Sequence, residues 1–275
     1  MERKFQTSSL LVVAVALALG SAAGCSKLRA RDKLNKGVQA YKNAQFEVAI
    51  EDFKEAKELD PGLLNARLYL ATAYASQYIP GAPSDENIRM GQQAIDEFQG
   101  VLRDDSGNLS AIDGIGSIYY NMGGTPFDPK KFEESKNYHK KHIELKPDDP
   151  EPYYWIGVID WSLAYRDNKE LRASFNAKAR KPIKDEDPMP PQVRDDFIKK
   201  DGAVVEEGID YLKKAIDRRP DYDDAMAYLN LLYRQKADME TSADARASDT
   251  KLADELVEKV KEVKQKRMEQ PAPKS

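Results

Sequence analysis

His139 and His142, the two histidines of the chain, are the residues whose type and spacing come nearest to a metal site. Three positions apart on a helix, both imidazoles would project from one face. Zinc sites use such pairs, but they need a third or fourth ligand from elsewhere in the fold. Both histidines fall where the helical pattern expects core-facing side chains. Packing is therefore the favoured interpretation, and the sequence predicts no metal and no cofactor.

Three acidic groups could in principle hold a cation: Asp185-Glu186-Asp187, Asp195-Asp196 and the segment from Asp221 to Asp224. The last has neither the turn glycine nor the closing bidentate glutamate of a calcium loop. Its carboxylates precede a predicted helix, where negative charge is stabilised by the helix dipole. We interpret the first two groups as solvated loop charge.

Gly114-Ile-Gly116 is a weak hint of a dinucleotide-binding turn, because the third glycine and the preceding strand are missing. The 275 residues contain no nucleophile-elbow motif, phosphate-binding loop, CxxC or haem-attachment motif. We therefore expect a binding protein and not an enzyme.

The single cysteine, Cys25, lies just after an N-terminal segment with the pattern of a secretory signal. Glu2, Arg3 and Lys4 are followed by an apolar run over residues 10–19 and then by small residues. The run is too short for a transmembrane helix, which needs about 20 residues.

Ala22-Ala23-Gly24-Cys25 resembles a bacterial lipobox, although leucine is commoner at the first position. The resemblance implies cleavage before Cys25, lipidation of its thiol, and anchoring in the cell envelope. Ser26, where the inner-membrane retention signal would have aspartate, favours the outer membrane, facing the periplasm. An ordinary signal peptide with a chance cysteine is the alternative.

The charge distribution argues against nucleic acid as a partner. Lys and Arg number 43 and Asp and Glu 47, which gives a net charge of −4 with both signs interspersed. A nucleic-acid-binding surface needs a basic patch or stripe, and none is visible.

Helical periodicity is clearest between Gly37 and Pro61. Apolar side chains recur every three or four positions, which predicts one buried helix face, and Asp60-Pro61 ends the helix. The members of this face are Phe46, Ala49, Ile50, Phe53 and Ala56.

This segment resembles a tetratricopeptide repeat (TPR), a 34-residue pair of antiparallel helices. Gly37, Ala49 and Ala56 match the small residues at which the two helices cross. Similar patterns recur four times downstream, including Ile115-Gly116 and Ile156-Gly157. The resemblance implies an all-α solenoid of about five helical hairpins, closed by a polar helix near residues 249–268 that carries Leu252, Leu256, Val260 and Val263 on one face.

Spacing between the repeat-ending prolines exceeds the 34-residue period, so the array contains insertions, near residues 77–92, 123–131 and 162–203. The predicted organisation is a signal peptide over residues 1–24, a lipid-anchored N-terminus over 25–29, a repeat domain over 30–268 and a disordered tail over 269–275. Insertions on one side of a solenoid map to one edge, often the binding edge.

The family resemblance also implies a concave groove lined by the first helix of each pair. Carried over by repeat register, the predicted groove residues are Tyr41, Tyr120, Tyr154, Val158 and Trp161. Aromatic side chains with a polar tip are common anchors at protein interfaces. Packing against the inserted loops is the alternative.

These observations predict a membrane-anchored scaffold that binds a peptide or helix of a protein partner. In layout the chain is similar to TPR lipoproteins of outer-membrane protein assembly and of pilus biogenesis. The alternative is a small-ligand-binding lipoprotein in which the 162–203 insertion forms a lid over the aromatic residues.

Overall fold

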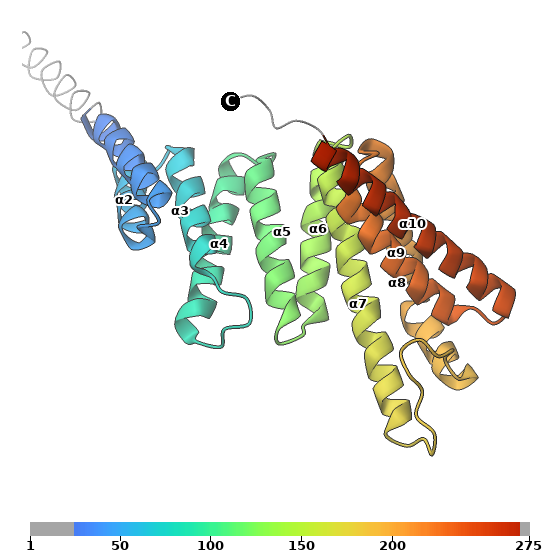
Figure 1. Cartoon of the computed structure of the whole chain (residues 1–275). Coiled ribbons are helices and arrows are strands. Elements are labelled where there is room, and N and C mark those ends of the chain that lie inside the picture. The colour runs from blue at the N-terminus through green and yellow to red at the C-terminus, as the bar shows by residue number, and fades with distance from the viewer. Residues whose placement is uncertain (1–24, 270–275) are drawn as a thin grey trace, which may run out of the picture. The chain divides into compact units, whose positions relative to one another are not determined.

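The computed structural model of the protein describes residues 25–269, and the regular structure in this part of the chain is helical throughout (Figure 1). Residues 25–42 form a first helix, followed by α2 (Phe46–Leu59), α3 (Leu64–Gln77), α4 (Asp85–Asp104), α5 (Leu109–Gly124), α6 (Pro129–Leu145), α7 (Pro150–Asn176), α8 (Pro191–Arg218), α9 (Asp223–Met239) and α10 (Ala243–Glu269). The order corresponds to five consecutive helix pairs, which confirms the predicted all-α class.

Some predictions fall at the ends of the described region. The predicted signal peptide, residues 1–24, and residues 270–275 of the predicted tail lie outside it. Residues 25–29, predicted as an N-terminus before the repeats, already belong to the first helix. Glu269, predicted as the first residue of the tail, is the last residue of α10.

The chain divides into two compact units, with the boundary between Asp128 and Pro129. The boundary lies within the predicted insertion at residues 123–131, and it separates α5 from α6. Each unit is described by itself below.

Close helix crossings at glycine organise the first unit, which contains residues 25–128. A Cβ atom at Gly37 would lie 2.5 Å from Cε1 of Phe53, so a side chain there would overlap the ring. Gly114 of α5 is in the same relation to Phe98 of α4. Gly116, to which the sequence interpretation gave a crossing role, is also buried in α5.

The first insertion is a short loop, residues 78–84, followed directly by α4. The buried amide of Asn87 holds this loop in place. Its Oδ1 accepts the backbone N–H of Ile79 at 2.6 Å, and its Nδ2 donates to the carbonyls of Ile79 and Ala82 at 2.8 and 3.0 Å. Because these backbone groups are satisfied by one side chain, the loop stays ordered without secondary structure of its own.

The second unit, residues 129–269, packs α7, α8, α9 and α10 around one apolar core. Phe197, Leu212 and Leu232 are fully buried in it. Gly157 lies against Leu212, and a Cβ at position 157 would overlap the leucine side chain. The predicted crossing of the fourth repeat at Gly157 is therefore confirmed.

The third insertion, residues 162–203, was expected to form loops, but most of it is helical. It lengthens α7 to 27 residues and α8 to 28, and only residues 177–190 connect them irregularly. Val193, Phe197 and Val205 of α8 are buried at helical spacing and pack with α7. The insertion is helical because this apolar stripe gives α8 a face that can be buried against α7.

The second unit also buries a charged cluster between α6, α7 and α8. Lys136 Nζ lies 2.6 Å from Asp160 Oδ1 and 2.9 Å from Glu207 Oε2. Asp160 is completely buried, and burial raises its pKa to about 7 against the opposing attraction of Lys136. Removing one partner of such a cluster leaves an uncompensated buried charge.

The last helix covers the core with few residues. Ala253 is fully buried, and Leu256 packs against the core of the second unit. Leu252, which the sequence analysis placed on one face with Leu256, is 39% exposed. The buried face of α10 is centred one residue later, on Ala253.

Candidate functional site

An aromatic row runs along α7 and α9 in the second unit, and its members in order are Tyr222, Tyr154, Tyr228, Trp161 and Tyr165. Consecutive ring centroids are 5.0, 5.8, 5.2 and 5.1 Å apart. These separations are typical of favourable aromatic pairs. The rings therefore form one continuous surface from two helices that are distant in sequence.

Polar contacts fix the Tyr222 end of the row. The Tyr222 hydroxyl donates to Glu151 Oε2 at 2.8 Å, and the guanidinium of Arg219 lies 4.2 Å from the ring centroid. Arg219 also pairs with Glu151 at 2.9 Å. Burial, followed by this hydrogen bond, raises the pKa of Tyr222 above its ordinary value, so the phenol stays protonated.

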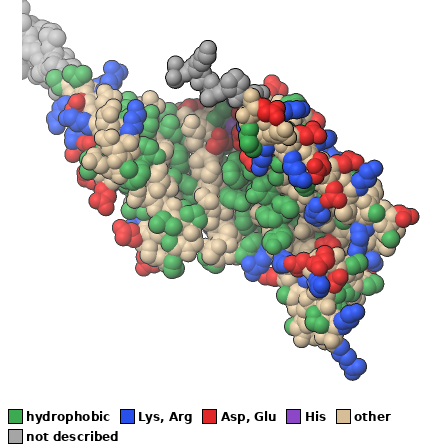
Figure 2. Space-filling model, viewed as in Figure 1, with side chains coloured by type: hydrophobic (Ala, Val, Ile, Leu, Met, Phe, Trp, Pro, Cys, Tyr) green, Lys and Arg blue, Asp and Glu red, His purple; other side chains and the backbone are tan. Residues whose placement is uncertain are grey.

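The other end of the row is open to solvent. Tyr222 is 6% exposed, Tyr154, Tyr228 and Trp161 are half-buried, and Tyr165 is 43% exposed. Figure 2 shows hydrophobic side chains gathered on the surface over α7. Contiguous exposed apolar surface of this kind marks interaction sites more often than isolated exposed residues do.

The predicted groove residues have different positions in the structure. Tyr154 and Trp161 are both in the aromatic row. Tyr41 and Tyr120 are half-buried residues of the first unit, and the Tyr41 hydroxyl shares a 2.7 Å hydrogen bond with Ser76. Val158 is only 1% exposed, so its inclusion was wrong: its side chain is part of the packing and cannot contact a partner in this conformation.

Sequence reasoning missed Tyr165, Tyr222 and Tyr228. A signal for Tyr165 was present, since it lies four residues after Trp161 and therefore shares its helix face. Nothing local in the sequence pairs Tyr228 of α9 with Trp161 of α7, because that contact depends on how the two helices pack.

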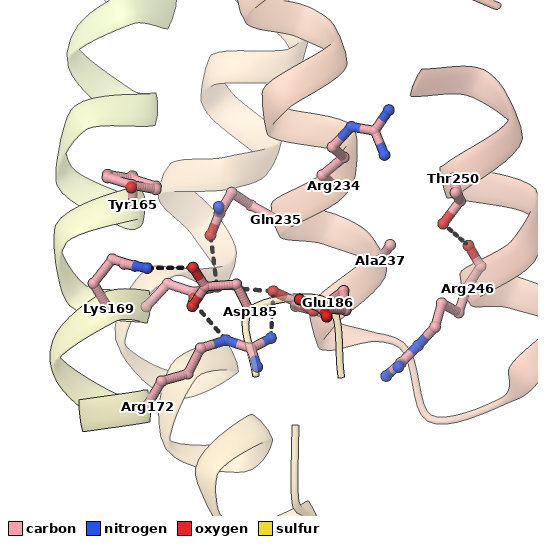
Figure 3. A pocket seen from close by; sticks show the side chains of 12 residues that line it. Tyr165, Lys169, Arg172, Asp185, Glu186, Arg234, Gln235, Ala237, Arg246 and Thr250 are labelled. Carbon is pink, nitrogen blue, oxygen red and sulfur yellow. Dashed lines mark hydrogen bonds and ion pairs between the residues drawn. The ribbon is translucent and has the colours of Figure 1, made fainter. Parts of the chain in front are cut away.

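A polar pocket of about 420 Å³ begins at Tyr165, where the row ends (Figure 3). Lys169 of α7 points toward Asp185 of the connecting loop, and Arg246 of α10 lies on the opposite side of the pocket. Lys169 pairs with Asp185 at 2.6 Å. The remaining lining residues are Asn168, Glu186, Arg234, Gln235, Ala237, Asp238 and Thr250.

The floor of this pocket is a buried network centred on Arg172, which is 4% exposed. Its guanidinium pairs with Asp238 of α9 at 2.9 Å and donates to the carbonyls of Lys184 and Asp187, each at 3.0 Å. Asn168 donates to Gln235 at 2.7 Å and to Asp238 at 3.0 Å. One arginine therefore ties the inserted loop to two helices.

His139 and His142 are both buried in the second unit, with 2% and 4% exposure. His139 stacks on Trp155, with ring centroids 6.1 Å apart. Burial, helped by the charge of His142, lowers the pKa of His139 to about 4, so this imidazole is neutral at pH 7. These positions agree with the packing interpretation. Across residues 25–269, no three His, Cys, Asp or Glu side chains are grouped as metal ligands would be.

The acidic groups have structural partners. Asp185 pairs with Lys169, and Asp195 lies 3.6 Å from Arg194. Asp223 and Asp224 lie in the first turn of α9, as the capping interpretation expects, and Asp223 pairs with Arg267 at 2.9 Å. Gly114 and Gly116 both lie inside α5 and not in a strand-to-helix turn, so the dinucleotide interpretation does not hold.

In the described part of the chain, no helix is both long and apolar enough to span a bilayer. Cys25 is exposed at the start of the first described helix.

No protein-family model matches the sequence, and no curated protein matches it significantly. Several solved structures do resemble the fold. A crystal structure of MamA protein aligns with a TM-score of 0.56 and 16% identity, covering 90% of this chain and 98% of that chain. MamA residues 41 to the end from Desulfovibrio magneticus RS-1 aligns with a TM-score of 0.55 and 16% identity, covering 86% and 96%.

A third solved structure is YrrB, described as a TPR protein with an unusual peptide-binding site. It aligns with a TM-score of 0.50 and 14% identity, covering 86% of this chain and 87% of that chain. Similarity at these identities concerns the fold alone. It agrees with the helix pairs, with the glycine crossings at Gly37 and Gly157, and with the repeat pattern of the sequence. The chain therefore has the fold of a tetratricopeptide-repeat protein.

Proposed function

We propose that the protein is an interaction scaffold that binds a peptide or helix of a protein partner along the aromatic row. The observation that carries the proposal is the row itself, which ends in the half-buried Trp161 and the exposed Tyr165. The row lies on α7 and α9, the first helices of two consecutive pairs. Large, rigid aromatic side chains contribute much of the binding energy at protein interfaces because ordering them costs little entropy. The peptide-binding site named for YrrB supports the same kind of function.

The partner should lose affinity when the exposed end of the row is truncated. We expect Trp161→Ala to weaken binding at least tenfold, since hot-spot aromatic residues contribute about 2 kcal/mol or more. Asp217→Ala is the matched control, because Asp217 is exposed on α8 and is not part of the row.

The experiment that tests the proposal is photo-crosslinking in cells from a reactive residue at position 161, followed by purification and mass spectrometry. A dominant protein adduct at 161 that is absent with the probe at 217 supports a scaffold. If the protein folds and no adduct specific to 161 forms, the scaffold proposal is wrong.

A lipid anchor at Cys25 is part of the proposal. It is supported by the signal pattern of residues 1–24 and by the exposure of the thiol. An acylated Cys25 would hold the protein in the cell envelope, with the outer membrane facing the periplasm as the proposed location. Several acyl chains give stable attachment, since each buried methylene contributes about 0.8 kcal/mol.

Cys25→Ser tests the anchor. We expect the unchanged protein to fractionate with membranes until detergent is added, and the variant to lose this attachment. Membrane attachment of Cys25→Ser that still depends on detergent would show that lipidation is not the anchor.

A second candidate function is favoured by the pocket beside Tyr165. Its volume of about 420 Å³ falls within the range of small-ligand sites, and the inserted loop forms one wall through Asp185 and Glu186. This arrangement fits a small-ligand-binding protein with the insertion as its lid. In that case a low-molecular-weight compound should co-purify with the protein, and Glu186→Ala should release it without affecting crosslinking at position 161.

A further inference from the structure

The tip of the long α7–α8 hairpin is a surface that the proposed scaffold function does not use. It consists of the last turn of α7, the loop over residues 177–190 and the first turn of α8. The aromatic row ends at Tyr165, and the Arg172 network joins the loop to α9 on the pocket side. Beyond Arg172, about one more turn of α7 precedes the connecting residues. Neither the aromatic row nor the Arg172 network therefore accounts for the tip of the hairpin.

The acidic and the basic residues of the loop differ in whether they have partners within the hairpin. Its acidic residues have partners within the hairpin: Asp185 pairs with Lys169, and Asp187 Oδ2 accepts the backbone N–H of Lys184 at 2.8 Å. Glu186 lies 3.8 Å from Lys184 Nζ. Each of the three carboxylates of the loop therefore has a partner within the hairpin itself.

The cations at the tip are different. Lys178, Arg180 and Lys181 are exposed, and none of them forms an ion pair with a residue between positions 25 and 269. The acidic groups that α8 brings toward the tip are Asp195, which pairs with Arg194, and Asp196, which lines a groove together with Lys178. Three cations within four residues thus face solvent. Figure 2 shows Lys and Arg side chains at the far end of this hairpin.

An open apolar groove of about 300 Å³ adjoins these cations. Its walls include Leu171 and Phe175 of α7 and Val193 of α8, and Lys178 lines its edge. Apolar side chains beside unpaired lysine and arginine are the combination found in segments that rest on anionic bilayers. The cations meet lipid phosphates, and the apolar part contacts the upper acyl region.

We propose that the hairpin tip docks on the surface of a bilayer containing anionic phospholipids, through Lys178, Arg180, Lys181 and the adjoining groove. Charge complementarity favours this occupant, because three exposed cations within four residues, without a shaped polar pocket, match a fluid layer of phosphates better than one fixed carboxylate. The inference rests on the proposed lipid anchor for its setting, since an anchored chain remains beside a membrane.

Docking is measured at the tip itself, independently of any anchor. The exposed Pro182 is replaced by cysteine and labelled with an environment-sensitive fluorophore, which leaves all three cations in place. The full chain without this cysteine, labelled in the same way, gives the background from Cys25. Both proteins are reconstituted with vesicles of phosphatidylcholine alone or with about one third phosphatidylglycerol, each containing a lipid with a quencher near the headgroup.

We expect several-fold stronger quenching with phosphatidylglycerol than without it. The difference should disappear in about 1 M salt, where the Debye length is about 3 Å. Lys178→Gln, Arg180→Gln and Lys181→Gln together should abolish it. The control triple Lys259→Gln, Lys264→Gln and Lys266→Gln removes the same charge from exposed positions of α10 and should leave it unchanged.

Equal quenching in both vesicle types, or none in either, would overturn the proposal even before any variant is made. Equal sensitivity to the two triple substitutions would overturn it as well, because it would reveal a net-charge effect. A protein adduct formed from position 182 in cells without lipid-dependent quenching would show that an acidic partner occupies the tip instead. The crosslinking test at position 161 is unaffected by any of these results, so the two proposals fail separately.

Discussion

Glycine at a helix crossing and glycine on an open helix face have opposite effects on stability. Gly157 lies against Leu212, whereas a Cβ at Gly202 would lie 3.7 Å from Ile198, an ordinary contact distance. Gly157→Ala should destabilise the protein by about 1–3 kcal/mol, because the added methyl group forces α7 and α8 apart. Gly202→Ala should stabilise it by about 0.5–1 kcal/mol through helix propensity.

Urea denaturation of both variants, monitored by circular dichroism, measures the two free energies of unfolding. A stabilising Gly157→Ala would contradict the close crossing. A destabilising Gly202→Ala would indicate that the α8 extension packs more tightly at that position than its contact distance implies.

Asp201 is a second residue with a measurable individual effect. It is 2% exposed, and burial, followed by the charge of Asp167, raises its pKa to about 7. In the unfolded chain its pKa has the ordinary value of 3.8, so between these values the folded state holds a proton that the unfolded state has lost. The stability contributed by protonated Asp201 is therefore complete below that ordinary value and is lost as the pH rises through about 7.

Asp201→Asn keeps the shape of the side chain and removes the titration. We expect the difference in Tm between variant and unchanged protein to increase in favour of the variant from about pH 5 to about pH 8. Burial also raises the pKa of Asp160 and lowers the pKa of His139. Both residues are present in the variant and in the unchanged protein, so their contributions cancel in the difference between the two Tm values. Parallel Tm curves would show that Asp201 ionises normally.

At the scale of elements, Arg172 decides whether the connecting loop is ordered. Residues 177–190 have no regular structure, and the guanidinium satisfies two of their carbonyls. Arg172→Met keeps the apolar stem but frees those carbonyls and leaves Asp238 without its guanidinium partner. We expect trypsin to cleave after Lys178 and Arg180 several-fold faster in the variant, since proteolysis follows the population of locally open states.

Arg166→Met is the matched control on the same helix. Arg166 is more exposed and pairs with Glu170 one turn away on the surface. Its loss should leave the cleavage rate in the loop unchanged, since surface pairs contribute about 0–1 kcal/mol. If both variants are cleaved equally fast, the loop is not held by Arg172.

At the scale of the whole molecule, each of the two units has buried aromatic side chains of its own. Phe53 in the first unit and Phe197 in the second are both fully buried. Substituting either by alanine should cost about 3–5 kcal/mol. In a repeat fold, where contacts are mainly between neighbouring elements, we expect that loss to be concentrated in the unit that carries the substitution.

Hydrogen exchange measured by mass spectrometry can show in which unit each substitution lowers stability. Phe53→Ala should reduce protection mainly in residues 25–128, and Phe197→Ala mainly in residues 129–269. A uniform loss of protection through both units after either substitution would show that they unfold as one cooperative body.

The sequence by itself determined the fold class and the end of α2 just before Asp60-Pro61. Periodic apolar residues such as Phe53, small residues such as Gly37 and Gly157, and a terminator such as Pro61 act within one or two neighbouring helices. Their effects can therefore be deduced from spacing alone. The same local pattern identified Tyr154 and Trp161 as binding candidates and kept His139 and His142 among the packing residues.

The tertiary structure alone decided which side chains share a surface. Val158 has the same helix register as the predicted groove residues, yet packing buries it, and Tyr228 joins Trp161 only because α7 and α9 lie together. The helical form of the third insertion also needed a partner face, which α7 and α8 supply to each other. Contacts between distant segments depend on how helices pack in space, and no local periodicity carries that information.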